Sequence, residues 1–261
     1  MLNHTIPPGS VGEERSHRQE APGVDPSRPR CRSCALATRC LPGRLESCEI
    51  HTFERAVSRS RPLRVGEHLF RMGDPFRSIF VVHNGSFKTC TVDTQGREHI
   101  GAFHFAGDLM GIDAIYPEMH VSSAIALSSA TVCILPYPVL TSLAREIPEI
   151  QAQILRMLSR EMLGNSSMAG DFTAEERLAA FLVMVSARQR HRARESTDLD
   201  LAMTRQDIAN YLRLAPETVS RVLARFQKSG LIRADRRHIA LLDTDGIQDL
   251  AACMNPYKRC G

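Results

Sequence analysis

The sequence predicts an α+β protein with an N-terminal β-roll, one long helix and a C-terminal winged helix-turn-helix domain. Three observations predict this order: apolar runs cut by turn residues over 63–136, an apolar helical stripe after Pro148, and two short helices around a tight turn over 204–232. The 261 residues suffice for two ordinary domains. With 43% apolar and 24% charged residues, the composition is globular and excludes a chain that is disordered throughout.

We place the boundaries where composition and pattern change. Residues 1–30 are rich in proline and poor in large apolar side chains, so they bury too little surface to offset the entropy of ordering and are predicted to be a disordered tail. The other predicted segments are a cysteine-rich segment (31–48), the β-roll (49–137, beginning with a connector to about Pro62), the long helix (138–170), the winged helix-turn-helix domain (171–250) and a second tail (251–261).

The chain carries no sign of a membrane segment. No uninterrupted apolar run approaches the roughly 18–20 residues that a membrane helix needs. The start of the chain lacks the basic residues and the apolar stretch of a signal peptide. We therefore expect a cytoplasmic protein without a membrane partner, whose cysteines are reduced thiols.

The β-roll is predicted from turn residues that recur about every 8–12 residues, as in an all-β barrel or sandwich. Asn84-Gly85 lies between two apolar alternations, over 78–82 and 86–92, and predicts a hairpin. The glycines at 66, 73, 101, 107 and 111 suit the tight corners of such a roll.

Two amphipathic helices are predicted after the β-roll, with Pro148 at the first position of one and a second over Glu175–Arg188. A polar, arginine-rich loop over 189–200 follows. The apolar residues of the first helix have a spacing close to that of a coiled coil, which leaves two interpretations open. They form a seam between two copies of the chain, or they pack against the chain's own β-roll. The candidate seam residues are Ile147, Ile150, Ile154 and Met157, with Asn165 near the end of the stripe.

The helix-turn-helix is predicted from local signals. Thr204 and Asp207 have the spacing of a capping box that opens a helix to Leu212, and Pro216 suits the first position of the next helix. The second helix has a buried face of apolar residues at i, i+3, i+4 and i+7. This face consists of Val219, Val222, Leu223 and Phe226.

The second helix of the helix-turn-helix presents Glu217, Ser220 and Arg221 on one exposed stripe. Arginine can donate two hydrogen bonds to guanine, glutamate can accept one from cytosine, and serine can contact either kind of base edge. An ion pair between Glu217 and Arg221 on a solvated face is the alternative. Because residues 201–237 hold eight basic and three acidic residues, an acid within this basic surface favours base reading in double-stranded DNA.

Cys31, Cys34 and Cys40 form a C-x2-C-x5-C pattern that can supply three metal ligands. Spacing alone leaves Cys48 and Cys133 as competing fourth ligands. It also leaves open a zinc ion, an iron–sulfur cluster or free thiols, since zinc and iron–sulfur clusters both accept four thiolates.

The order of these parts over residues 31–250 resembles the CRP/FNR transcription regulators, and three stretches are similar to the FNR branch. They are Phe103-His104-Phe105-Ala106-Gly107-Asp108-Leu109, Glu175-Glu176-Arg177-Leu178-Ala179-Ala180-Phe181, and Met203-Thr204-Arg205 through Gly230, which contains Glu217-Thr218-Val219-Ser220-Arg221. The resemblance implies that the β-roll is a cyclic-nucleotide-binding-like jelly roll and that Thr218 and Arg205 join the DNA-binding residues.

The resemblance further implies a [4Fe-4S] cluster on Cys31, Cys34, Cys40 and Cys133, and an oxygen-responsive regulator rather than an enzyme. Such a protein binds palindromes of the form TTGAT-N4-ATCAA as a homodimer, contacts RNA polymerase and controls anaerobic genes. Gly111-Ile112-Asp113 and His120-Val121-Ser122 lack the acid and the arginine with which the cyclic-nucleotide branch holds its ligand, and Arg97 departs from the FNR polymerase contact. The alternatives are zinc or redox sensing through the thiols, an enzyme or electron carrier that uses the cluster, and a small-molecule-responsive regulator.

Overall fold

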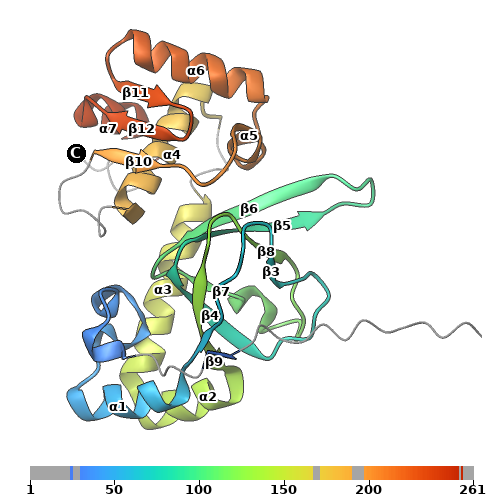
Figure 1. Cartoon of the computed structure of the whole chain (residues 1–261), viewed down its shortest axis with the longest axis vertical. Coiled ribbons are helices and arrows are strands. Elements are labelled where there is room, and N and C mark those ends of the chain that lie inside the picture. Colours follow the sequence, from blue (N-terminus) through green and yellow to red (C-terminus); the bar gives the residue numbers. More distant parts are fainter. Residues whose placement is uncertain (1–23, 26–29, 167–170, 190–196, 253, 255–261) are drawn as a thin grey trace, which may run out of the picture.

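The computed structural model describes residues 24–25, 30–166, 171–189, 197–252 and 254. The predicted tails, 1–30 and 251–261, fall largely outside these ranges, as do Cys253, Cys260 and the side chain of Asn165. Figure 1 shows a β-roll at the centre, helices on one side and below it, and a small helical domain above. Among the described helices, none is long and apolar enough to cross a membrane.

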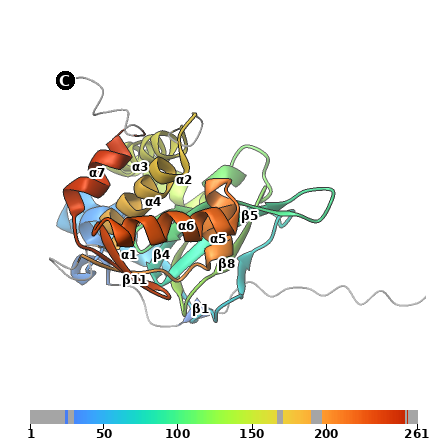
Figure 2. The same ribbon diagram turned by 90° about the horizontal axis from the view of Figure 1, so that it is seen from above.

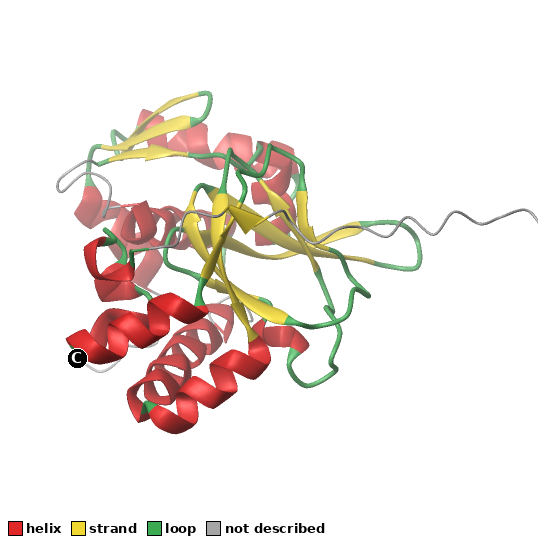
Figure 3. Cartoon of the chain, turned by 60° about the horizontal axis from the view of Figure 1, so that its bottom comes forward, coloured by secondary structure: helices red, strands yellow, loops and turns green. Residues whose placement is uncertain are grey.

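The β-roll consists of two antiparallel sheets that pack face to face (Figure 3). The first sheet has the order β1-β2-β9-β4-β7 and the second β3-β8-β5-β6. The strands are β1 (Val24–Asp25), β2 (Ser58–Ser60), β3 (His68–Phe70), β4 (Ser78–Asn84), β5 (Ser86–Val92), β6 (Glu98–Phe105), β7 (Leu109–Met110), β8 (Ser123–Ala126) and β9 (Thr131–Pro136).

The hairpin predicted at Asn84-Gly85 is wrong, although the turn is present. β4 pairs with β7 and β9, whereas β5 pairs with β6 and β8, so the turn carries the chain from one sheet to the other. Gly85 has φ +83°, and a Cβ there would lie 2.6 Å from the Cβ of Ala130. Only glycine fits this crossing, because a side chain would meet both backbone strain and a steric clash.

The helical part differs from the prediction in two places. The connector before Pro62 contains a helix, α1 (Ser47–Ala56), whose N-terminus is capped by Glu46 and Glu49. The segment 138–170 contains a helix that was not predicted, α2 (Tyr137–Glu146), before the long helix α3 (Pro148–Ser166), which begins at Pro148 as predicted. The break between the two helices comes at Pro148, because proline lacks an N–H and pushes the preceding residue out of helical conformation.

Helix α3 buries the residues that were assigned to a seam between chains. Ile150 is fully buried, and Ile147 and Met157 are buried with it in a core shared with the cysteine-rich segment and the β-roll. Ile154 is half-buried against the same core. The structure therefore shows the second interpretation of the near-coiled-coil spacing, packing within this chain, and the assignment of these residues to a seam between two copies stays a prediction.

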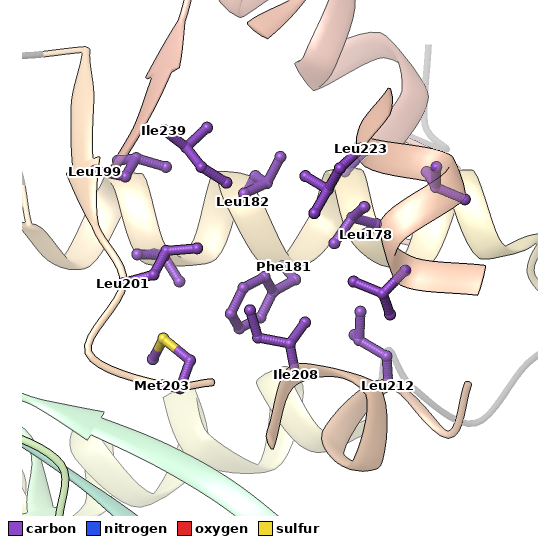
Figure 4. Packing of buried hydrophobic residues seen from close by; sticks show 14 of the residues in the cluster. Leu178, Phe181, Leu182, Leu199, Leu201, Met203, Ile208, Leu212, Leu223 and Ile239 are labelled. Atoms are coloured by element: carbon purple, nitrogen blue, oxygen red, sulfur yellow. The ribbon is translucent and has the colours of Figure 1, made fainter. Parts of the chain in front are cut away.

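The C-terminal domain has the predicted winged helix-turn-helix order. Figure 4 shows its core, in which Leu178, Phe181 and Leu182 of the first helix meet residues from the later elements. The predicted polar loop over 189–200 ends in a short strand that joins the wing sheet. The elements are α4 (Ala174–Gln189), β10 (Asp198–Asp200), α5 (Arg205–Leu212), α6 (Pro216–Lys228), β11 (Ile232–Asp235), β12 (His238–Leu241) and α7 (Thr244–Ala252).

Helix α5 is docked on the β5–β6 hairpin of the β-roll. The Ile100 N–H donates to the side-chain oxygen of Asn210 at 2.8 Å, and the Asn210 amide donates to the Glu98 carbonyl at 2.7 Å. Beside this pair, the Lys88 ammonium donates to the carboxylates of Glu98 and Asp207 at 2.7 and 2.9 Å. The side chain of Asn210 thus hydrogen-bonds to the backbone of β6 and connects the helix-turn-helix to the β-roll.

Replacing Asn210 with alanine is expected to weaken this contact by about 1–3 kcal/mol, because the Ile100 N–H and the Glu98 carbonyl lose their partner. Urea unfolding followed by far-UV circular dichroism measures the change. Gln206→Ala, on the exposed face of the same helix, is the matched control and is expected to stay within about 0.5 kcal/mol of wild type. Equal stabilities for Asn210→Ala and the control would contradict the assignment.

Candidate nucleic-acid interface and candidate metal centre

Local chemistry fixes the geometry of α5 and α6. The Asp207 N–H donates to the Thr204 hydroxyl at 3.1 Å and the Thr204 N–H donates to the Asp207 carboxylate at 2.9 Å, which completes the predicted capping box. Arg213 ends α5 in the left-handed conformation, with φ +56°. α6 then begins at Pro216, as predicted, and lies at the opposite end of the molecule from α1 and α2 (Figure 1), on the outer surface that faces the viewer in Figure 2.

The exposed stripe of α6 carries the three residues that were predicted to read bases. Glu217, Ser220 and Arg221 are all exposed. The Arg221 guanidinium donates to the hydroxyl of Thr218 at 3.1 Å, and the Ser220 hydroxyl donates to the Pro216 carbonyl at 3.0 Å. The alternative Glu217–Arg221 ion pair is not among the ion pairs of the described residues, so both charges face outward.

Arg205 takes a different position from the other predicted DNA-binding residues. Its side chain is half-buried, and the guanidinium donates to the Arg236 carbonyl at 3.0 Å. Arg236 lies in the turn between β11 and β12, with φ +47°. Arg205 therefore holds the wing against α5, and it lies off the exposed stripe of α6.

The four cysteines that the family resemblance singled out line one small pocket. Cys31, Cys34 and Cys40 come from three short 3-10 turns over 31–44, and Cys133 comes from the middle of β9. The competing ligand Cys48 is exposed on α1 and does not line this pocket. In the described ranges, no three His, Cys, Asp or Glu side chains form a ready-made site for a single metal ion, so a metal that binds here must draw the thiols together.

Burial raises the pKa of three of the thiols that line this pocket. It raises the pKa of Cys31 to about 12, with added repulsion from Cys133, and it raises the pKa of Cys40 still further. Burial also raises the pKa of Cys133, whereas the nearby Arg59 guanidinium opposes that shift. Because metals bind thiolates, a metal group that enters the pocket must displace these protons.

A half-buried arginine completes the pocket, and sequence reasoning missed it. Arg59 on β2 lies directly opposite Cys133 on β9, and both residues line the pocket. The Nε of Arg59 is buried and has no hydrogen-bond partner among the described residues. An unpaired buried donor costs about 1–3 kcal/mol, so a pocket with four sulfur donors and this orphan N–H fits a negatively charged metal–thiolate group.

Comparison with known proteins identifies the family. Residues 176–250 match the Crp-like helix-turn-helix domain, and residues 60–146 match the cyclic nucleotide-binding domain. The chain is 39% identical to the Fumarate and nitrate reduction regulatory protein of Vibrio cholerae, over 87% of this chain and 92% of the relative. It is 42% identical to the Transcriptional activator protein anr of Pseudomonas aeruginosa, over 82% and 89%. The chain is an FNR-type member of the CRP/FNR family.

The structural comparison agrees with this membership. FixK2 from Bradyrhizobium japonicum superimposes with a TM-score of 0.67 at 26% identity, covering 74% of this chain and 96% of FixK2. The family and its named relatives are transcription regulators, so this FNR-type chain is not an enzyme.

A cavity of about 500 Å³ lies between the regulator's β-roll and helices α4 and α5, and it reaches Gly111–Asp113 and Val121-Ser122. There the Ser122 hydroxyl donates to the Asp113 carboxylate at 3.1 Å, so these two polar groups satisfy each other. This pairing agrees with the predicted loss of the acid and the arginine that hold a cyclic nucleotide.

Proposed function

We propose that this FNR-type regulator senses oxygen through a [4Fe-4S] cluster on Cys31, Cys34, Cys40 and Cys133. With the cluster present it binds palindromic sites of the TTGAT-N4-ATCAA type as a homodimer, contacts RNA polymerase and controls anaerobic genes in the cytoplasm. The observation that carries the proposal is that four cysteines, three of them about a hundred residues from the fourth, line one pocket together with the half-buried Arg59. When bound, the cluster supplies an oxygen-labile cross-link between the cysteine-rich segment and β9.

The residues around the pocket connect that cross-link to the rest of the molecule. Leu41, next to Cys40, is fully buried against α3 in the same core as Ile150 and Met157. The Gln153 amide of α3 also approaches the Cys40 carbonyl, at 3.5 Å. Release of the cysteine-rich segment would therefore remove part of the support of α3. Coupling of this kind requires the cluster and DNA to favour the same state.

The proposed dimer seam lies on the face of α3 opposite its buried residues. Leu155 and Met162 are spaced i, i+7 and expose 59% and 71% of their surface, with the half-buried Leu158 between them. Apolar residues repeated at this spacing on an uncovered helix face form the contact stripe of a paired helix. A twofold axis through this stripe would bring the same residues of two copies together.

Replacing Leu155 with glutamate is expected to convert the dimer to a monomer, because the twofold axis places two like charges in an apolar contact. Sedimentation velocity on anaerobic protein measures the change. Val65→Glu is the matched control, since Val65 exposes 70% of its surface in a β-roll turn away from α3, and it should remain dimeric. A dimeric Leu155→Glu protein would show that the seam lies elsewhere.

DNA binding in the presence and absence of oxygen tests the proposed function. We expect fluorescence anisotropy under nitrogen to show binding to the palindromic duplex at least about a thousand-fold tighter than to a duplex with scrambled half-sites. Air should abolish this preference. If the preference for the palindrome is the same under nitrogen and in air, the proposed oxygen response is contradicted but the proposed DNA specificity stands. If the palindrome is preferred under neither condition, both parts of the proposal are contradicted.

A further inference from the structure

The pocket of the four cysteines would hold a large negative charge when a metal group is bound. Four thiolates bring four negative charges into a site where Cys31 is buried and Cys34, Cys40 and Cys133 are half-buried. An iron–sulfur core offsets only part of this charge, and a residual charge in a poorly solvated site is costly unless it is paired and hydrogen-bonded. A fixed cation beside the sulfurs would reduce that cost.

Arg59 has the position of such a cation. The β2–β9 pairing places it opposite Cys133, and this register is held by the Ser60 hydroxyl, which accepts from the Val132 N–H at 3.0 Å. Its side chain lines the pocket together with Cys133, while its buried Nε has no partner within the described part of the chain. A donor that is buried, charged and unpaired points to an acceptor that arrives with the bound group.

The other charged groups near the pocket are less suited to this role. Arg30 lines the pocket from an exposed position, where water screens its charge. His83 shares the lining and contacts the Thr131 hydroxyl, and burial together with Arg59 lowers its pKa, so it is neutral. Glu54 accepts from the Arg32 N–H at 3.0 Å and adds negative charge near Cys31.

We propose that Arg59 is the counter-cation of the metal centre, which orients the Cys133 sulfur and offsets the charge of the thiolates when a metal group is bound. This inference rests on the proposed function and extends it to a residue outside the ligand set. Arg59 is a positioning residue, since it acts through Cys133 rather than as a ligand. Its effect should depend on metal: the buried Nε of Arg59 has no acceptor among the described residues, so the arginine gains its partner only when a metal group is bound.

The test uses Co²⁺, whose thiolate complexes are coloured, added to the metal-free full chain under nitrogen. Arg59→Gln is expected to weaken the Co²⁺ affinity by about 10- to 100-fold, the range for loss of a residue that orients a ligand. Arg59→Lys keeps the charge and should fall between wild type and Arg59→Gln. Arg55→Gln, which removes an exposed arginine from α1, should bind Co²⁺ like wild type.

Thermal unfolding of the metal-free variants separates this role from a structural one. A counter-cation predicts that Arg59→Gln melts no lower than wild type without metal, although its Co²⁺ affinity is reduced. Equal Co²⁺ affinities for wild type and Arg59→Gln would overturn the proposal. So would a metal-free Arg59→Gln protein that melts lower than wild type or fails to fold.

Iron analysis of the anaerobically purified wild type keeps this result apart from the proposed function. If the wild type holds no iron, the oxygen-sensing proposal fails, whatever the Co²⁺ titrations show. If the wild type holds iron and Arg59→Gln binds Co²⁺ as tightly as wild type, only the counter-cation role fails. If the oxygen-sensing proposal and the counter-cation role are both correct, the Arg59→Gln protein should also lose its iron faster than the Arg55→Gln protein during dialysis against a chelator.

Discussion

Replacement of Cys133 with serine is expected to remove the iron of the anaerobically purified protein, from about four atoms per chain to nearly none. Cys133 is the one residue of the proposed ligand set that comes from the β-roll, so its loss would break the cross-link to the cysteine-rich segment. The affinity for the palindrome under nitrogen should then fall to that of air-treated wild type. Iron analysis and anisotropy on the same sample measure both effects.

Cys48→Ser is the matched control for this prediction. Cys48 is an exposed thiol on α1 outside the pocket, so its removal should change neither the iron content nor the DNA affinity. Full iron retention by the Cys133→Ser protein would contradict the proposed ligand set. Iron loss from the Cys48→Ser protein would instead make Cys48 the fourth ligand, the choice that sequence spacing left open.

Replacement of Arg221 with alanine is expected to cost about 1–3 kcal/mol of specific binding for each recognition helix, so roughly 2–6 kcal/mol for a dimer. Arg221 is exposed on α6, where its guanidinium is held by the Thr218 hydroxyl at 3.1 Å. The loss should be confined to the palindrome, because a base contact discriminates between sequences and a phosphate contact does not. Anisotropy with palindromic and scrambled duplexes measures the difference.

Arg225→Ala is the control on the same helix. Arg225 is exposed, but its guanidinium pairs with Glu175 of α4 at 2.9 Å. Its removal should weaken binding to both duplexes by similar small factors and leave their ratio unchanged. If Arg221→Ala behaves in the same way, Arg221 contacts phosphates and does not read bases.

The helix-turn-helix was predictable because its signals are local. A capping box at Thr204 and Asp207 and a proline at position 216 act within one turn of helix, and the structure has both where they were expected. The buried face of α6 was predictable for the same reason, since Val219 and Phe226 lie on one face of a single amphipathic helix. Nothing distant in the sequence is needed to fix these features.

The features that sequence reasoning missed depend on contacts between distant segments. Asn84-Gly85 has the composition of a hairpin turn, yet the approach of Ala130 decides that the chain crosses between sheets. The spacing of Ile147, Ile150 and Met157 cannot say whether the covering surface belongs to this chain or to a second copy. Arg59 is one basic residue among many until the β2–β9 register places it beside Cys133.

The measurement that tests the central claim most directly is an absorption spectrum with iron and sulfide counts, taken before and after air is admitted. For protein purified under nitrogen, the account predicts broad visible absorption, about four irons and four sulfides per chain, and bleaching in air. Parallel anisotropy should show that the preference for the palindrome disappears with the colour. A colourless protein without iron that still prefers the palindrome would contradict the cluster and leave a DNA-binding regulator with another signal.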